Sequence, residues 1–292
     1  MSDNHVRNHA LILEYRGDEF QGYQFQADQP TVQGALERAL STLLRAEIKT
    51  HCSGRTDTGV HATGQVVSFQ TEHAVKGHSA RADGGIDEWR FLHSLNAVLP
   101  DGIAARRLID VPLDFHARFS SLAREYEYLI WNAPTRTPHW HGRALWRRDR
   151  LPVEELNEQL STLPGHRDFA AMTRLEYKDE TTIRYVDFAQ IKRVLDPITG
   201  SDDLVSFRIR GNAFLHNMIR IIVGTLLDIS QAKVRGDLNE ILETGDRLRA
   251  GQTAAAVGLY FRHSYYAPME GVEGLATLTD YPVFRRKPPI NH

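Results

Sequence analysis

The sequence predicts an α+β fold made of two similarly built halves, with a seam near residues 115–150. Three observations predict it. Segments with apolar residues at helical spacing alternate irregularly with segments that read as strands. The second half echoes the general order of the first, without a short-period sequence repeat. Two strand-like segments joined by the turn DPITGSDD indicate an antiparallel hairpin. This mixture of patterns is typical of α+β proteins.

The first half begins with HALILEYRG (9–17), which reads as a buried strand ending in a glycine turn. Residues 31–46 carry apolar side chains at helical spacing, and Thr31 after Pro30 is suited to cap that helix. Residues 76–88, rich in glycine and charge, predict a mobile insertion. The other elements expected here are strands at 47–53, 65–71 and 103–111 and a helix at 89–99.

The second half opens with the alternating segment 117–133, which predicts a strand from about Ala123 onward. Its other expected elements are an aromatic and basic loop at 136–150, helices at 153–163, 214–230 and 238–247, strands at 181–194 and 203–214, and a short helix followed by a strand at 254–267. We therefore predict an N-terminal subdomain at 1–115, a C-terminal subdomain at 116–270 and a tail at 271–292.

The composition is that of an ordinary globular protein, because 41% of the 292 residues are hydrophobic and 25% are charged. The start of the chain has no apolar stretch typical of a secretory signal, and no run reaches the roughly 20 apolar residues that cross a bilayer. Cys52 is the single cysteine, which excludes an intrachain disulfide and a thiolate metal cluster. We expect a cytoplasmic protein without a membrane partner.

The charge distribution leaves room for a nucleic-acid partner. The net charge of −2 weakens that interpretation, since nucleic-acid-binding domains are usually basic. A local basic stripe is sufficient, however, and arginines crowd the middle of the chain with few acids between them. These are Arg106, Arg107, Arg118, Arg124, Arg136, Arg143, Arg147, Arg148 and Arg150. The alternative is a solvated basic face with no ligand.

The stretch SGRTDTGVHATGQV (53–66) contains the clearest candidate for chemistry, Asp57. Asp-Thr-Gly is also the spelling of an aspartic protease motif, in which two carboxylates share one proton. The chain has no second copy, and the motif lacks the apolar lead-in of a buried strand, which argues against a protease. A turn in which Asp57 only caps the backbone is the plain alternative. Arg55, His61 and three glycines surround the carboxylate, which favours a ligand-binding loop.

SGRTDTGVHATGQVVSF resembles the signature G-R-T-D-x-G-V-H-A-x-G-Q-V of the TruA-type tRNA pseudouridine synthases. Further segments resemble the family's motifs in the same order, so that the resemblance runs from about residue 9 to about 270. These segments are LEYRGDEFQGYQFQ, HSLNAVLPDGIA, DFHARFSSLAREYEY, GNAFLHNMIRIIVGTLL and AAAVGLYF. Thr58, Tyr23 and the longer insertion depart mildly from the family pattern.

The resemblance implies a pseudouridine synthase fold, in which two α+β subdomains share a mixed, largely antiparallel central sheet with flanking helices. It implies an isomerase that converts uridine to pseudouridine at positions 38, 39 and 40 of the tRNA anticodon stem-loop. The enzymes of this family use neither a metal nor an organic cofactor, and they act as homodimers on tRNA. A related synthase with other RNA targets and a non-catalytic RNA-binding protein on the same fold remain the alternatives.

By the same resemblance, Asp57 is the catalytic carboxylate, Arg220 the basic residue that pairs with it, and Tyr126 the active-site tyrosine. Periodicity alone does not choose between Tyr126 and Tyr128, because residues two apart on a strand share a face. Arg55 matches the arginine that assists base flipping, and Leu259 matches an apolar wall of the uracil pocket, for which core packing is an equal account. The arginines expected to contact phosphate are Arg118 and Arg124.

Overall fold

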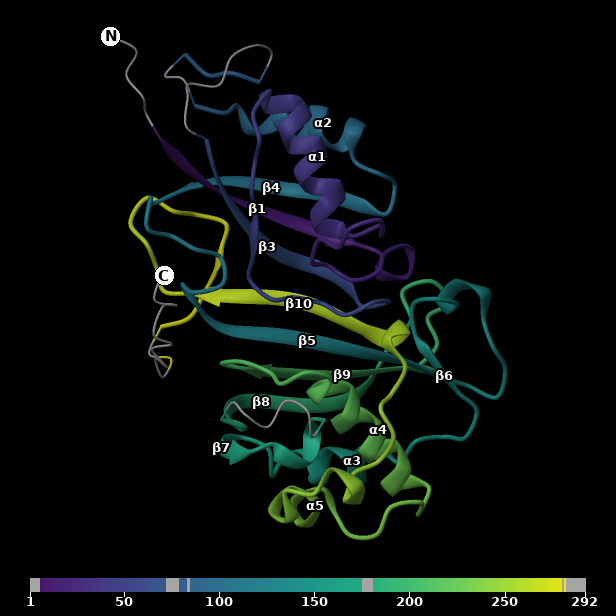
Figure 1. Cartoon of the computed structure of the whole chain (residues 1–292). Helices are drawn as coiled ribbons and strands as arrows, with labels where there is room; N and C mark the ends of the chain where they lie inside the picture. The colour runs from purple at the N-terminus through teal and green to yellow at the C-terminus, as the bar shows by residue number, and fades with distance from the viewer. Residues whose placement is uncertain (1–5, 72–78, 83–84, 175–180, 280, 282–292) are drawn as a thin grey trace. The chain divides into compact units, whose positions relative to one another are not determined.

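Strands pair mostly antiparallel in the computed structural model, and helices pack beside them, so the predicted α+β class is confirmed (Figure 1). The structure describes residues 6–71, 79–82, 85–174, 181–279 and 281. The chain divides into two compact units. Unit 1 comprises Met1–Leu122 and Phe261–His292, and unit 2 comprises Ala123–Tyr260.

This division differs from the predicted one, because the chain returns to unit 1 near its end. Tyr266 is 1% exposed and packs on Phe115, with ring centroids 5.0 Å apart. Its hydroxyl donates a hydrogen bond to the carbonyl oxygen of Ala117 at 2.9 Å. These contacts bury Ala117 and Tyr266 in the core of unit 1, which joins residues 116–122 and 261–279 to that unit. The order of motifs along the sequence gives no sign of such a return.

The sheet of unit 1 is centred on β1. Its strand order is β4 (Ile103–Val111), β1 (Arg7–Tyr15), β3 (His61–Thr71) and β10 (Leu259–Tyr266), with β2 (His51–Cys52) on β3 and β11 (Ala276–Thr277) parallel to β10. Leu11 is fully buried between Val67 of β3 and Leu108 of β4. This central position explains why β1 reads as a continuous apolar run.

The two predicted helices of unit 1 are confirmed as α1 (Val32–Leu44) and α2 (Glu88–Val98). Thr31 caps α1 as predicted, since its Oγ1 accepts a hydrogen bond from the amide of Gly34 at 3.3 Å. Leu36 and Leu40 are one turn apart on α1 and are both fully buried. The spacing that predicted the helix is therefore the spacing of its buried face.

The strand predicted at 47–53 is reduced to the two residues of β2. Side chains of α1 take the backbone donors that a longer strand would use. Glu37 Oε1 accepts from the amide of Thr50 at 2.9 Å, and Ser41 Oγ accepts from the amide of Ile48 at 3.1 Å. Because these amides already have partners, the segment follows the helix rather than the sheet.

The predicted insertion at 76–88 lies partly outside the described residues. Its described parts form a turn. Ala80 and Ile86 make an antiparallel bridge, and the amide of Arg81 donates to the carbonyl of Gly85 at 2.8 Å. Ile86 is 2% exposed. A single buried apolar residue among glycines and charges is thus enough to hold this part in place.

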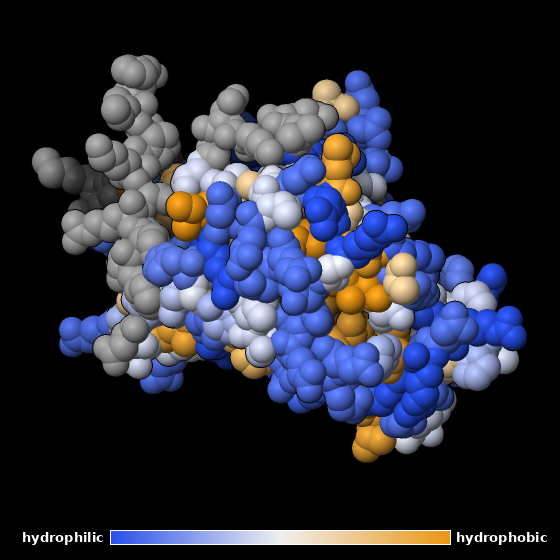
Figure 2. Space-filling model, turned by 90° about the horizontal axis from the view of Figure 1, so that it is seen from below, coloured by the Kyte–Doolittle hydropathy of each residue, from blue (hydrophilic) through white to orange (hydrophobic). Residues whose placement is uncertain are grey.

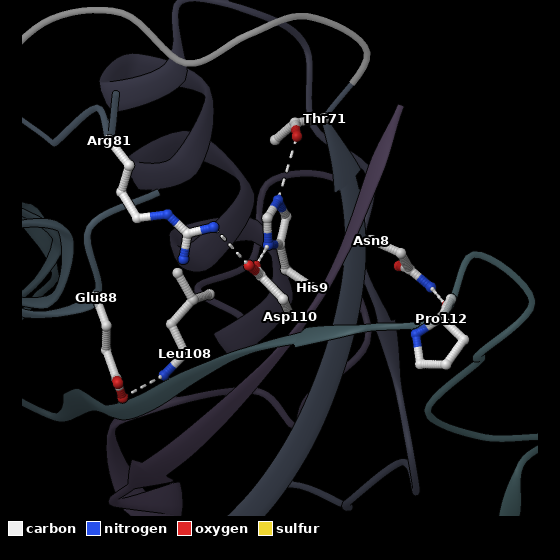
Figure 3. Close-up of polar contacts among 8 residues, drawn as sticks. All are labelled: Asn8, His9, Thr71, Arg81, Glu88, Leu108, Asp110 and Pro112. Atoms are coloured by element: carbon white, nitrogen blue, oxygen red, sulfur yellow. Dashed lines mark hydrogen bonds and ion pairs between the residues drawn. The ribbon is translucent and has the colours of Figure 1, made fainter. Parts of the chain in front are cut away.

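Polar side chains tie this turn to the sheet (Figure 3). His9 is fully buried, with Nδ1 2.9 Å from Asp110 Oδ1 and Nε2 3.2 Å from Thr71 Oγ1. In this arrangement Nδ1 donates to the carboxylate. Arg81 Nη2 donates to Asp110 Oδ2 at 3.3 Å. Asp110 therefore connects β1 and β4 with the turn at residues 79–82.

Asp110→Asn is expected to reduce the loss in free energy of unfolding that accompanies a fall in pH. The hydrogen bond from His9 is the main cause that lowers the pKa of Asp110, helped by the charges of His9 and Arg81 and opposed by burial. A carboxyl with a lower pKa in the folded state stabilises the fold above its unfolded pKa of about 4, and it loses that stabilisation as the pH falls from there through its lower folded pKa. Urea unfolding at pH 7 and at about pH 2.5 should show a smaller acid loss for Asp110→Asn than for wild type or for the exposed control Asp101→Asn. Equal losses would contradict the assignment.

The sheet of unit 2 is built around the predicted hairpin. Its strand order is β5 (Ser121–Asn132), β9 (Leu204–Gly211), β8 (Ile183–Val194) and β7 (Gly165–Asp168), with β6 (Leu145–Arg147) parallel to β5. β8 and β9 pair antiparallel with Ile191 opposite Phe207, which confirms the hairpin. The sequence did not indicate β6 and β7, because three or four residues are too few for a periodic pattern.

The predicted helices of unit 2 are confirmed as α3 (Val153–Leu160), α4 (Met218–Ser230) and α5 (Leu238–Thr244). α4 starts four residues later than predicted. Asn217 has φ 59°, a left-handed conformation that asparagine tolerates and that a continuous right-handed helix excludes. Residues 216 and 217 therefore form a turn ahead of the helix, and this turn bears on the site described below.

Seen from below, the molecule shows mostly hydrophilic residues with hydrophobic ones in a few groups (Figure 2). Large hydrophobic side chains that are exposed in unit 2 include Ile183, Leu195, Ile198 and Leu248. Scattered exposure of this kind is usual on folded proteins. Among the described helices, none has the length and apolar character needed to span a membrane.

Candidate active site

Asp57 lies in the polar loop between β2 and β3 and is half-buried. Its carbonyl oxygen accepts a hydrogen bond from the amide of Val60 at 3.1 Å, which closes a tight turn. Gly59 completes the turn with φ +80°, a conformation that favours glycine. The local structure around Asp57 is thus a turn, and contacts from two neighbouring segments hold it in place.

Gln65 clamps the start of this loop from β3. Its Oε1 accepts from the hydroxyl of Ser53 at 2.7 Å, and its Nε2 donates to the carbonyl of Gly54 at 2.6 Å. Gln65 is fully buried, and Ser53 is 1% exposed. Buried polar groups with complete hydrogen bonding hold one geometry. The residues just before Asp57 are therefore fixed by a side chain of the neighbouring strand.

The opening loop after β1 clamps the other side. Tyr15 Oη lies 2.8 Å from Thr56 Oγ1, and the amide of Tyr23 donates to the carbonyl of Thr56 at 3.0 Å. The amide of Gly17 donates to Nδ1 of His61 at 3.1 Å, and His61 is 2% exposed. His61 is therefore a buried residue that fixes the opening loop through its ring nitrogen. Thr56, which directly precedes Asp57, is thus held by both its side chain and its backbone.

Close backbone approach makes Gly17 necessary at this position. A Cβ built on Gly17 would lie 2.0 Å from the carbonyl oxygen of Val60 and 2.3 Å from its carbonyl carbon. Backbone atoms cannot rotate away as the end of a side chain does. A methyl group here therefore has to push the opening loop away from the loop of Asp57.

Gly17→Ala is expected to destabilise the protein by about 1–3 kcal/mol, the usual cost of forcing an extra group into a packed site. Gly200→Ala is the matched control, because Gly200 has φ +73° but no atom within 4 Å of the place its methyl group would take. The free energy of unfolding from urea titration should fall clearly further for Gly17→Ala than for Gly200→Ala. Equal losses would mean that the close approach at Gly17 costs no more than the left-handed backbone strain at Gly200.

Unit 2 carries the two tyrosines of β5 on one face. Tyr126 is 8% exposed, and its ring meets that of Phe214 edge-on, with centroids 5.2 Å apart. Tyr128 is fully buried, and its hydroxyl donates to the carbonyl of Ala255 at 2.7 Å. Burial raises the pKa of Tyr128 well above its usual value, although the charge of Arg220 opposes this. Tyr128 is therefore a neutral core residue with its hydroxyl committed to the backbone.

Arg220 is half-buried on α4, and its guanidinium group is oriented by two acceptors. Nε donates to the carbonyl of Ala254 at 2.8 Å, and Nη1 donates to Oδ1 of Asn217 at 2.8 Å. The left-handed turn at Asn217 thus supplies one of the acceptors. These contacts distinguish Arg220 from an arginine that merely extends to the surface from an apolar helix.

Leu259 follows the segment that holds Arg220 and Tyr128. It is 5% exposed and is the first residue of β10. A Cβ on the preceding Gly258 would lie 2.6 Å from the carbonyl oxygen of Leu129 and 2.7 Å from the ring of Tyr128. Because Gly258 has no side chain, residues 254–259 lie directly against β5. This segment therefore carries Leu259 and also contacts Tyr128 and Arg220.

The remaining predicted arginines differ in exposure. Arg55 and Arg118 are exposed and line one cavity of unit 1. Arg124 is 8% exposed, and its Nη1 donates to the carbonyl of Asn212 at 2.9 Å. Phosphates of a nucleic acid are met at the surface. Of the arginines predicted to contact phosphate, Arg118 has the more suitable position, while Arg124 is held inside unit 2.

Sequence reasoning missed the residues that position the loop, namely Tyr15, Gly17 and Gln65, although all three stand inside the quoted motifs. Among the described residues, no three His, Cys, Asp or Glu side chains are grouped in a way that could hold a metal ion. Taken separately, unit 1 offers a carboxylate in a held loop, and unit 2 offers a buried tyrosine and an oriented arginine.

The α+β fold and the firmly held carboxylate loop fit the isomerase class that the sequence resemblance implies. The chain is a member of the tRNA pseudouridine synthase family, because the family model of that description matches residues 11–120 and 160–267. Among curated relatives, "tRNA pseudouridine synthase A" of Leptospira biflexa is 38% identical over 89% of this chain and 94% of its own length. The proteins of the same name from Acetivibrio thermocellus and Geobacillus kaustophilus are 36% and 37% identical, over 89% and 87% of this chain and over 100% and 93% of their own lengths.

Among solved structures, a chain in "Crystal Structure of a Cbf5-Nop10-Gar1 Complex" aligns with 91% of this chain and 61% of its own length. The TM-score is 0.33 and the sequence identity 12%, which is too low a similarity to bear on the fold. The family assignment therefore rests on the family model and on the curated relatives.

Proposed function

We propose that this protein isomerises uridine to pseudouridine in the anticodon stem-loop of tRNA, at positions 38, 39 and 40, with Asp57 as the catalytic carboxylate. Membership of the tRNA pseudouridine synthase family supports the reaction and the substrate class. The observation that carries the role of Asp57 is its loop, which Gln65, Tyr15 and the Gly17 backbone hold from two sides. A catalytic group has to be held in a productive geometry in this way.

The reaction breaks the bond between N1 of uracil and C1′ of the ribose, turns the base, and rejoins it through C5. The proton on C5 is released, and N1 gains a proton, so atoms and charge balance. Asp57 has three routes open to it: attack on C1′, attack on C6 of the base, or removal of the C2′ proton to give a glycal. Each route requires the ionised carboxylate, which a nearby cation favours.

The other site residues take their proposed roles from the same chemistry. Arg220 is the basic partner of the catalytic carboxylate in this proposal, and its two acceptors support a fixed guanidinium group. Tyr126 stacks on the flipped uracil and receives the C5 proton, while Leu259 forms the apolar wall of the pocket. Arg55 occupies the place of the flipped base, and Arg118 meets phosphate.

The functional unit in this proposal is a cytoplasmic homodimer that binds tRNA across both subunits. The single cysteine, Cys52, is in keeping with a reducing compartment, because the chain contains no disulfide to maintain. Size-exclusion chromatography with light scattering should give twice the mass of the 292-residue chain. A stable monomer that retains full activity would contradict the dimer.

Tritium release tests the proposed function. A tRNA transcript labelled with tritium at C5 of uridine should lose one tritium to water for each pseudouridine formed. Transcripts with a lone uridine at position 38, 39 or 40 should release it, and a transcript with its lone uridine outside the anticodon stem-loop should not. Release only from the last transcript would indicate a synthase with another target. Tight binding without release from any transcript would indicate an RNA-binding protein that is not an enzyme.

A further inference from the structure

Unit 1 contains a cavity of about 250 Å³ beside the loop of Asp57. Its lining includes Tyr23, His51, Arg55, Arg118 and Phe119, but neither Asp57 nor any other carboxylate. Small-molecule pockets usually measure about 300–1,000 Å³, so this cavity is suited to something smaller, such as one nucleobase. A lining with two arginines and no acid makes the cavity attractive to an anion.

The wall that carries Arg118 and Phe119 is a turn built around His116. The amides of Arg118 and Phe119 approach Nδ1 of His116 at 3.1 and 3.4 Å, and the amide of His116 donates to Ser120 Oγ at 3.0 Å. An Nδ1 that accepts hydrogen bonds carries no proton. Burial, and next the neighbouring His51, lowers the pKa of His116, which keeps its ring neutral. The ring therefore serves as an aromatic surface and as a support for the turn.

Aromatic rings follow one another along this wall. The ring centroids of His51 and His116 are 4.6 Å apart, and those of His116 and Phe119 are 4.4 Å apart. Phe119 is 46% exposed, although a phenylalanine ring usually gains by burial. The guanidinium carbon of Arg118 lies 5.9 Å from the centre of the Phe119 ring. An exposed ring with a cation beside it is the pairing that binds a base together with its phosphate.

The inner wall of the cavity is polar. Tyr23 and Thr50 both line it, they are 1% and 3% exposed, and Thr50 is the side-chain hydrogen-bond neighbour of the Tyr23 hydroxyl. The cavity thus combines aromatic faces and two cations with a buried polar wall.

We propose that this cavity binds one unpaired nucleotide of the RNA next to the target uridine, with its base on Phe119 and its phosphate on Arg118. The nucleotide is not the target itself, because Asp57 is not part of the lining. It is a neighbour of the target, since Arg55 lines the cavity only two residues before Asp57, a reach of about 7 Å at most. This inference rests on the proposed function and adds a second recognition site to it.

Phe119→Ala is expected to raise KM for a stem-loop RNA about tenfold or more and to leave kcat within about threefold, because stacking on an aromatic side chain is commonly worth 1–3 kcal/mol per base. Phe119→Trp should restore KM. Phe25→Ala is the matched control, as Phe25 is a 57% exposed phenylalanine of the same unit that does not line the cavity. Thermal unfolding shows that each variant is folded.

A cycle of abasic RNAs identifies the nucleotide. Stem-loop RNAs are made with one abasic residue at each position flanking the target, and their Kd values are measured by fluorescence anisotropy. One abasic position should weaken binding to wild type about tenfold and leave binding to Phe119→Ala unchanged. Absence of coupling at every position, with normal tritium release by wild type, would overturn the second site and leave the proposed function intact. Absence of release by wild type would count against the proposed function instead.

Discussion

Replacement of Asp57 by asparagine is expected to reduce the rate of tritium release by about 10⁴-fold or more, the loss typical of removing a catalytic nucleophile or base. Asparagine has nearly the same shape but carries no negative charge. The backbone contacts of the loop, such as the hydrogen bond from Val60 to the carbonyl of Asp57, do not depend on that charge. The fold should therefore be unchanged, and the Kd for tRNA should remain within about threefold of the wild-type value.

Asp114→Asn is the control for this experiment. Asp114 is an exposed carboxylate of unit 1 that lies outside the loop of Asp57. Its replacement should leave both the rate and the Kd unchanged. Single-turnover tritium release with saturating enzyme separates the chemical step from binding. A rate for Asp57→Asn within about tenfold of wild type would rule out Asp57 as the catalytic carboxylate.

Tyr126→Phe is expected to slow the single-turnover rate by about 10²–10⁴-fold, the usual contribution of a group that transfers a proton. The ring remains and continues to pack on Phe214, so stability should change little. Tyr128→Phe should behave in the opposite way. It removes the buried hydrogen bond to Ala255, which costs about 1 kcal/mol of stability, and it leaves the chemistry nearly unchanged.

The two tyrosine variants together form a matched pair on one strand. Single-turnover tritium release and the urea midpoint should be measured for both. The rate should fall mainly in Tyr126→Phe, and the midpoint mainly in Tyr128→Phe. Equal loss of rate in both variants would contradict the assignment of the proton transfer to Tyr126 and of a structural role to Tyr128.

The tyrosines also show how much of the candidate site can be predicted from the sequence. Spacing placed Tyr126 and Tyr128 on one face of a strand but did not separate them, because both read as buried aromatics. The two tyrosines are distinguished by the hydrogen bond from the Tyr128 hydroxyl to the carbonyl of Ala255, which lies 127 residues further along the chain. Contacts of such long range leave no periodic trace in a sequence. The same holds for Tyr15 and Gln65, which are 50 residues apart and meet beside the loop of Asp57.

The elements that differ from prediction have local physical causes. α4 begins late because Asn217 adopts a left-handed conformation, and β2 is short because Glu37 and Ser41 take its donors. Neither effect follows from hydrophobic spacing, which predicted the helices and the longer strands. The return of the chain to unit 1 at Phe261 depends on the packing of Tyr266, and a list of elements in order does not contain it.

The most direct test of the central claim is analysis of the product itself. An unmodified tRNA transcript is incubated with wild type or with Asp57→Asn at concentrations that give equal tRNA occupancy, and the digested nucleosides are separated by liquid chromatography. Wild type should convert uridine at positions 38, 39 and 40 to pseudouridine, with one tritium released for each, and Asp57→Asn should give none above background. Pseudouridine formed at the wild-type rate by Asp57→Asn, or none formed by a wild type that binds tRNA, would contradict the account.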